Sequence, residues 1–200
     1  DATSELAEQL EQGEKSCVKE ILGDLWQRID VTFIYGETGK EARLVFPEHY
    51  EEAVENTPAR ILFTQHHGTG NNYRQCFYNK EMDYRKYDEL FVLAKAQDKQ
   101  EVLVDMVFNR LEYPYDLTDK NKDEYKDYML EHFVQWSEIL VEQDAIERLQ
   151  FLSKQSLWNR EMLDIAIMEA SEKKRGETLS FLMNEKQSLY PERKKKTFEL

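Results

Sequence analysis

The chain has 200 residues, of which 40% are hydrophobic and 12% aromatic, so it can bury a core of ordinary size. Its 40 acidic and 27 basic side chains give a formal net charge of −13, which argues against binding to the phosphate backbone of a nucleic acid. No apolar run approaches the roughly 18 residues that span a membrane, no signal-peptide core is visible, and two cysteines are too few for a disulfide framework. We therefore expect a cytoplasmic protein.

Along the chain, the first predicted elements are a helix and a β-hairpin. Residues 5–28 carry apolar side chains at helical spacings, which predicts one broken helix or two. The period then changes, because Val31, Phe33 and Tyr35 alternate with polar residues. The turn "GETGK" and the run "EARLVF" follow, which completes a predicted hairpin. The next stretch, "EHYEEAVEN" at residues 48–56, predicts a short acidic helix.

A second hairpin is predicted from "ARILFTQHH", "GTGNN" and "YRQCFYN". Its tip is the run of glycine and asparagine at residues 68–72, because these residues tolerate the positive φ of a tight turn. Residues 1–80 are therefore predicted to form a small α+β unit with two hairpins and about four strands.

Helical patterns dominate from Tyr84 onward, where glycine and proline are rare. Short polar connections between the helical segments favour antiparallel helix pairs. The predicted fold class is α+β, with the α+β unit at residues 1–80, a stack of helix pairs at 84–187 and a basic tail at 188–200.

Two alignments without gaps indicate an internal repeat in the helical half. Residues 91–107 align with residues 167–183 at an offset of 76, and residues 133–152 align with residues 163–182 at an offset of 30. Helix pairs such as "LDIAIMEASEKKRGETLSFLM" resemble degenerate ankyrin repeats, and the resemblance covers roughly residues 84–187. It implies a stack of about three α-hairpins, and stacked pairs leave an elongated exposed face.

The stretch "TQHHGTGNNYRQC" contains the candidates for chemistry, namely His66, His67, Arg74 and Cys76. Adjacent residues of a strand point to opposite faces, so the two histidines cannot easily serve one site. We therefore interpret the stretch as a hairpin loop without catalytic residues. The alternative is a small enzyme or ligand-binding site, which requires these side chains to converge in a cleft.

Four aromatic residues, Tyr113, Tyr115, Trp136 and Trp158, are candidates for partner contacts, because tyrosine and tryptophan are enriched in interface hot spots. The expected function is non-catalytic protein–protein interaction, with no cofactor, metal, nucleic acid or membrane. A third possibility is an acidic inhibitory or regulatory protein. In either case the negative charge favours a partner with a basic or mixed-charge patch. The sequence makes no prediction of the oligomeric state or of the partner's identity.

Overall fold

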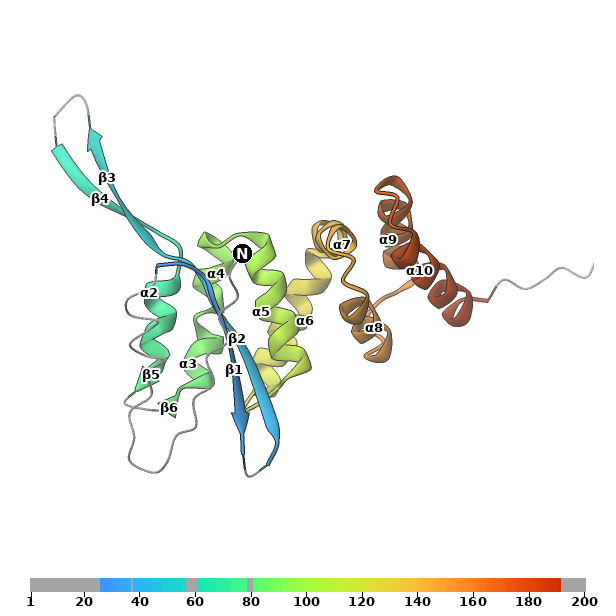
Figure 1. Ribbon diagram of the computed structural model, residues 1–200, viewed down its shortest axis with the longest axis horizontal. Coiled ribbons are helices and arrows are strands. Elements are labelled where there is room, and N and C mark those ends of the chain that lie inside the picture. Colours follow the sequence, from blue (N-terminus) through green and yellow to red (C-terminus); the bar gives the residue numbers. More distant parts are fainter. Residues whose placement is uncertain (1–25, 37, 57–60, 79–80, 192–200) are drawn as a thin grey trace, which may run out of the picture. The chain divides into compact units, whose positions relative to one another are not determined.

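The computed structural model describes residues 26–36, 38–56, 61–78 and 81–191 (Figure 1). The helix predicted over residues 5–28 lies almost wholly outside these ranges, as does most of the predicted basic tail. The chain divides into two compact units, Asp1–Tyr125 and Lys126–Leu200. This division falls inside a helix, whereas the change from strands to helices falls at Tyr84.

Strands β1 (Ile29–Tyr35) and β2 (Lys40–Phe46) form the first antiparallel hairpin, as predicted. Val31, Phe33 and Tyr35 share the half-buried face of β1, which follows from their alternation with exposed residues. Strand β2 packs on helix α5 (Gln100–Glu112), and its residues 42 and 44–46 are almost completely buried. This hairpin therefore belongs to the core of the first unit.

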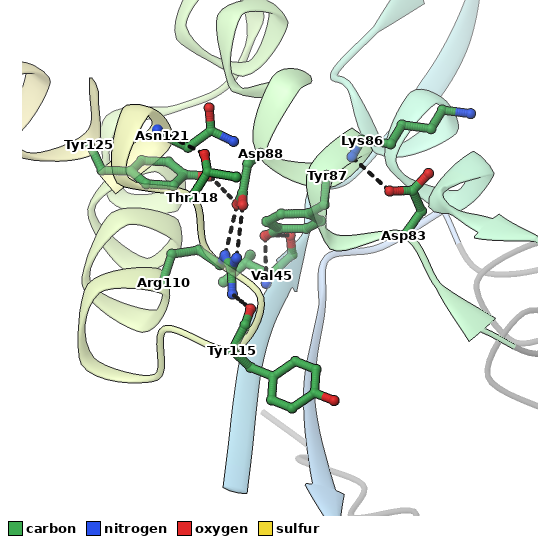
Figure 2. Close-up of polar contacts among 10 residues, drawn as sticks. All are labelled: Val45, Asp83, Lys86, Tyr87, Asp88, Arg110, Tyr115, Thr118, Asn121 and Tyr125. Atoms are coloured by element: carbon green, nitrogen blue, oxygen red, sulfur yellow. Dashed lines mark hydrogen bonds and ion pairs between the residues drawn. The ribbon is translucent and has the colours of Figure 1, made fainter. Parts of the chain in front are cut away.

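The hydroxyl of Tyr87 covers the outer edge of β2 at Val45 (Figure 2). It accepts a hydrogen bond from the backbone N–H of Val45 at 3.0 Å and donates one to the carbonyl of Val45 at 2.7 Å. An exposed strand edge presents unpaired N–H and C=O groups that can pair with other chains. One buried side chain satisfies both groups here.

The acidic helix predicted at residues 48–56 is wrong. This stretch contains strand β3 (Tyr50–Asn56), which pairs antiparallel with β4 (Ile61–His67). The register places Val54 opposite Phe63 and Glu51 opposite His66. Cross-strand pairs of this kind stabilise a sheet, and they depend on a partner strand that a local pattern does not contain.

The hairpin tip predicted at residues 68–72 is also wrong. Residues Gly70–Tyr73 form the short helix α2, the 3-10 turn η1 (Arg74–Cys76) follows, and β5 (Phe77–Tyr78) then pairs with β6 (Glu81–Met82). Gly68 does have a positive φ of 74°, but both glycines also allow close backbone approach. A Cβ at Gly68 would lie 2.1 Å from the carbonyl oxygen of Glu48, and one at Gly70 would lie 2.1 Å from that of Pro47.

Helices follow from Tyr84, as predicted, and the α+β fold class is confirmed. In addition to α5 they are α3 (Tyr84–Glu89), α4 (Phe91–Gln97), α6 (Asp119–Glu131), α7 (Phe133–Glu142), α8 (Ile146–Lys154), α9 (Arg160–Glu172) and α10 (Gly176–Leu189).

In the second unit, the turn between α7 and α8 matches the turn between α9 and α10 at an offset of 30 residues. Asp144 and Lys174 have φ of 48° and 58°. The residue after each donates its N–H to the carbonyl of Leu140 or Ala170, at 2.9 Å in both cases. The turn between α4 and α5 differs, because Asp98 has φ of −94°. The resemblance to ankyrin repeats stays a prediction.

Candidate functional site

His66 and His67 lie on opposite faces of β4, and each contacts its own glutamate on β3. The Nδ1 atom of His66 is 3.3 Å from Oε1 of Glu51, and the Nε2 atom of His67 is 3.2 Å from Oε2 of Glu52. The His67 ring also stacks on Tyr50, with 4.6 Å between ring centroids. The two imidazoles therefore do not converge on one reacting atom.

Cys76 and Arg74 lie in the 3-10 turn that follows α2. The Cys76 side chain is fully buried, and burial raises the pKa of its thiol to about 12. A thiol with that pKa is almost entirely protonated at neutral pH and is a poor nucleophile. Arg74 is half-buried in the same turn. The described ranges contain no group of three or more His, Cys, Asp or Glu side chains placed to hold a metal.

Trp136 and Trp158 lie in the core of the second unit. Trp136 is fully buried, and Trp158 is 5% exposed with its Nε1–H donating to Oγ of Ser153 at 3.1 Å. Rings this deeply buried present almost no surface to another protein.

Tyr113 and Tyr115 are half-buried, and both make contacts within the first unit. The guanidinium carbon of Arg43 lies 4.0 Å from the ring centroid of Tyr113. The Tyr115 ring stacks on Tyr35 at a centroid distance of 4.0 Å, and the hydroxyls of Tyr35 and Tyr84 form a hydrogen bond of 2.5 Å. These rings join the loop before α6 to the first hairpin.

Asp88 on α3 and Arg110 on α5 form a buried ion pair (Figure 2). The Arg110 atoms Nε and Nη2 donate to the Asp88 carboxylate at 2.7 and 2.8 Å, and Nη1 donates to the carbonyl of Tyr115 at 3.0 Å. The hydroxyl of Tyr125 donates to Asp88 at 2.8 Å. Every nitrogen of the guanidinium has a partner, and both side chains are closed to solvent. We interpret the pair as a fixed structural link.

The most unusual surface in the described part of the chain is the hairpin of β3 and β4, which we call the exposed hairpin. Ile61, Leu62 and Phe63 are consecutive, and they are 60%, 71% and 48% exposed. Each of the two strands pairs only with the other among the described residues. Exposed apolar clusters on folded proteins are typical of interaction sites. Reasoning from the sequence missed them, because an apolar run in a strand is typical of a buried strand.

The two faces of the exposed hairpin differ in composition. Alternation along each strand places four apolar side chains on one face together with three polar ones, namely Tyr50, Val54, Ile61 and Phe63 with Glu52, Gln65 and His67. The opposite face carries a mixture of apolar and acidic side chains, namely Glu51, Ala53, Glu55, Leu62, Thr64 and His66. Both faces therefore combine apolar and charged groups, and the first carries the larger share of the apolar side chains.

The base of the exposed hairpin is tied to the turn between α4 and α5. The N–H of Thr69 donates to Oδ1 of Asp98 at 3.1 Å, and its hydroxyl donates to the other carboxylate oxygen. Thr69 is buried, and burial raises the pKa of Asp98 above its ordinary value. Together with the close backbone approach at Gly68, these bonds anchor the base.

No protein-family model, curated protein or solved structure gives a significant match to the chain. None of the helices in the described ranges combines the length and the apolar character that crossing a membrane requires. The case for a function therefore rests on the residues themselves.

Proposed function

We propose that the chain is a cytoplasmic, non-catalytic protein-interaction module, and that its exposed hairpin docks an extended, basic segment of a protein partner. The observation that carries the proposal is the run Ile61–Phe63, three large apolar side chains that face solvent on a strand that pairs, within the described residues, with β3 alone.

The stability of two-stranded sheets supports docking by strand addition. An isolated hairpin is at best marginally stable in water, and independent stability requires either a third strand or packing against a helix. A partner segment that adds a strand satisfies backbone groups along one outer edge and covers part of the apolar surface. Burial of apolar area contributes about 25 cal/mol per Å², so covering these side chains drives the association.

The charge of the hairpin supports a basic partner. Glu51, Glu52 and Glu55 alternate across both faces of β3, and the whole chain carries a formal charge of −13. A cation opposite a glutamate on a neighbouring strand is a favourable cross-strand pair, whereas an acid there is unfavourable. The overall charge also increases the rate at which a basic segment is encountered.

The helix pairs of the second unit form a scaffold within this proposal. Their matched turns support the ankyrin-like interpretation, and the carboxylate of Asp144 joins them by accepting from Arg175 and Thr178, each at 3.0 Å. A stack of this kind presents a preformed surface of its own.

A selection from a displayed library of random nine-residue peptides tests the docking proposal. The bait is the whole chain, and no variant is used to remove peptides during the selection. The expected result is enrichment of lysine and arginine alternating with valine, isoleucine or an aromatic residue. Enrichment of acidic peptides would contradict the proposal, and so would a selection in which no peptide is enriched.

The matched control for Phe63→Ser is Ile34→Ser. Ile34 lies on β1 of the first hairpin and is 69% exposed, so its substitution removes similar apolar surface from a different sheet. We expect the selected peptides to lose at least about tenfold in affinity for Phe63→Ser, which is a typical effect at an interface hot spot, and to keep their affinity for Ile34→Ser.

A further inference from the structure

A pocket of about 120 Å³ lies at the base of the exposed hairpin. Glu48 and Tyr50 line it from the start of β3, and His67 lines it from the end of β4. Gln97, at the end of α4, and Asp98 and Lys99, in the turn before α5, complete the polar part of its wall. The pocket is therefore continuous with the surface that the proposed segment occupies.

One wall of this pocket is aromatic. The ring of Tyr50 stacks on the imidazole of His67 with an interplanar angle of 14°, and Tyr50 is 46% exposed. A cation above the face of such a ring is attracted by the ring's electrons, and the planar guanidinium of arginine also stacks on it. The wall therefore favours a flat cationic group.

The charges of the pocket favour a cation as well. Its lining contains two carboxylates, Glu48 and Asp98, and one ammonium, Lys99, so its formal charge is −1 with His67 neutral. The Asp98 carboxylate is held in place by Thr69. The Glu48 carboxylate already binds a cation, because Nζ of Lys99 donates to its Oε1 at 2.8 Å.

The bond between Lys99 and Glu48 is easily exchanged. The Lys99 side chain is 71% exposed and that of Glu48 is 42% exposed. Exposed ion pairs contribute little to stability, since water screens the charges and the long side chains lose entropy. An incoming cation with better geometry can therefore displace the ammonium from Glu48.

We infer that this pocket binds an arginine side chain of the segment that docks on the exposed hairpin, an inference that rests on the function proposed above. The guanidinium donates two parallel hydrogen bonds to the two carboxylate oxygens of Glu48, a planar arrangement that lysine cannot make. Its flat face lies on Tyr50. The pocket's volume of about 120 Å³ is several times what one water molecule needs, so the pocket has room for a planar guanidinium.

The test uses a small probe, so that it does not depend on strand addition. The whole chain, labelled with ¹⁵N, is titrated with Nα-acetyl-arginine methylamide and, separately, with the neutral isostere Nα-acetyl-citrulline methylamide. The expected result is a saturable shift of the backbone amide signals of Gly68, Asp98 and Val102 with the arginine derivative alone. Equal responses to both compounds, or no saturable response, overturn the inference.

Two substitutions at the rim have opposite expected effects. Glu48→Gln removes the charge that holds the guanidinium and weakens binding of the arginine probe about tenfold, as expected for loss of a charged hydrogen bond. Lys99→Met removes the competing ammonium and strengthens binding severalfold.

The control Lys120→Met changes the net charge by the same amount on the exposed surface of α6, outside the pocket lining. We expect it to leave the affinity for the arginine probe unchanged. Equal gains for Lys99→Met and Lys120→Met overturn the inference, because they indicate a general effect of charge.

The pocket and the docking proposal can fail separately. If selected peptides bind in a way that depends on Phe63 while the arginine probe does not bind, the pocket inference is overturned and the docking proposal stands. If the probe binds and responds to Glu48→Gln while no basic peptide is selected, the pocket binds free guanidinium groups and the docking proposal is overturned.

Discussion

The two hairpins of the first unit contain nearly the same apolar triplet in opposite environments. The run "LVF" at residues 44–46 of β2 is almost completely buried, whereas the run "ILF" at residues 61–63 of β4 is about half exposed or more. Both lie in seven-residue strands of two-stranded antiparallel sheets. Strand composition therefore does not decide burial in this protein.

What differs is the surroundings of each triplet. The first hairpin packs on α5, and Tyr87 covers its edge at Val45. In the described part of the chain, the contacts that anchor the exposed hairpin lie at its base, where Gly68 approaches Glu48 and Thr69 bonds to Asp98. We therefore regard the first hairpin as structural and the second as the element that presents a binding surface. Four substitutions test this distinction, and they follow in order of expected effect on stability.

Arg110→Met is expected to have the largest effect on stability. This substitution leaves the buried carboxylate of Asp88 without its cation. The pair joins α3 to α5, the helix on which the first hairpin packs. The free energy of unfolding should fall by about 3–5 kcal/mol, measured by urea denaturation. Arg160→Met, at an exposed position of α9, should change it by less than about 0.5 kcal/mol. A loss below about 1 kcal/mol for Arg110→Met would contradict the structural role of the pair.

Gly68→Ala tests the base of the exposed hairpin. A side chain costs about 1–2 kcal/mol at the left-handed φ of +74°, and overlap with the Glu48 carbonyl adds about 1–3 kcal/mol. Gly39→Ala, in the turn of the first hairpin, has a similar φ of +63° but no heavy atom within 4 Å, so it carries only the first cost. Thermal unfolding of both variants measures the difference, and equal losses would contradict the close approach at Gly68.

Tyr87→Phe tests the covered edge of β2. It leaves a buried N–H and a buried C=O of Val45 without their hydrogen bonds, so stability should fall by about 1–3 kcal/mol. The control is Tyr50→Phe on the exposed hairpin, where solvent is available and the change should stay below about 0.5 kcal/mol. Urea denaturation measures both values. An unchanged free energy of unfolding for Tyr87→Phe would indicate that the hydrogen bonds at the edge of β2 do not contribute to stability.

Phe63→Ser should have the smallest effect on stability, within about 0.5 kcal/mol, because the ring is already half exposed. The same substitution should weaken binding of a selected basic peptide by at least about tenfold, measured by calorimetry. A large loss of stability without a loss of affinity would mean that Phe63 belongs to the core and not to an interface.

Local periodicity predicts much of this fold. The alternation of Val31, Phe33 and Tyr35 and the helical spacings after Tyr84 lead to the observed elements, because those patterns record which face is buried. The misassigned elements depend on partners distant in the chain. Strand β3 requires β4, and the glycines at 68 and 70 are needed because residues 47 and 48 pass beside them.

The sequence did not predict the exposed apolar run as an interaction site. His66 and His67 are candidates because histidine side chains can bind ligands or transfer protons, and both lie on the exposed hairpin. The apolar run beside them carries the proposal, and no local signal distinguishes an exposed run from a buried one. The buried pair of Asp88 and Arg110 is separated by 22 residues, and it becomes visible only when α3 and α5 pack together.

Hydrogen exchange of the whole chain, with and without a selected basic peptide, tests the central claim most directly. The exposed hairpin should exchange quickly in the free chain, because its amides lie near solvent, and the peptide should slow exchange within residues 50–56 and 61–67. Residues 29–35 and 40–46 should be unaffected. Protection that appears in the first hairpin or in the second unit, with none in β3 and β4, would contradict the account.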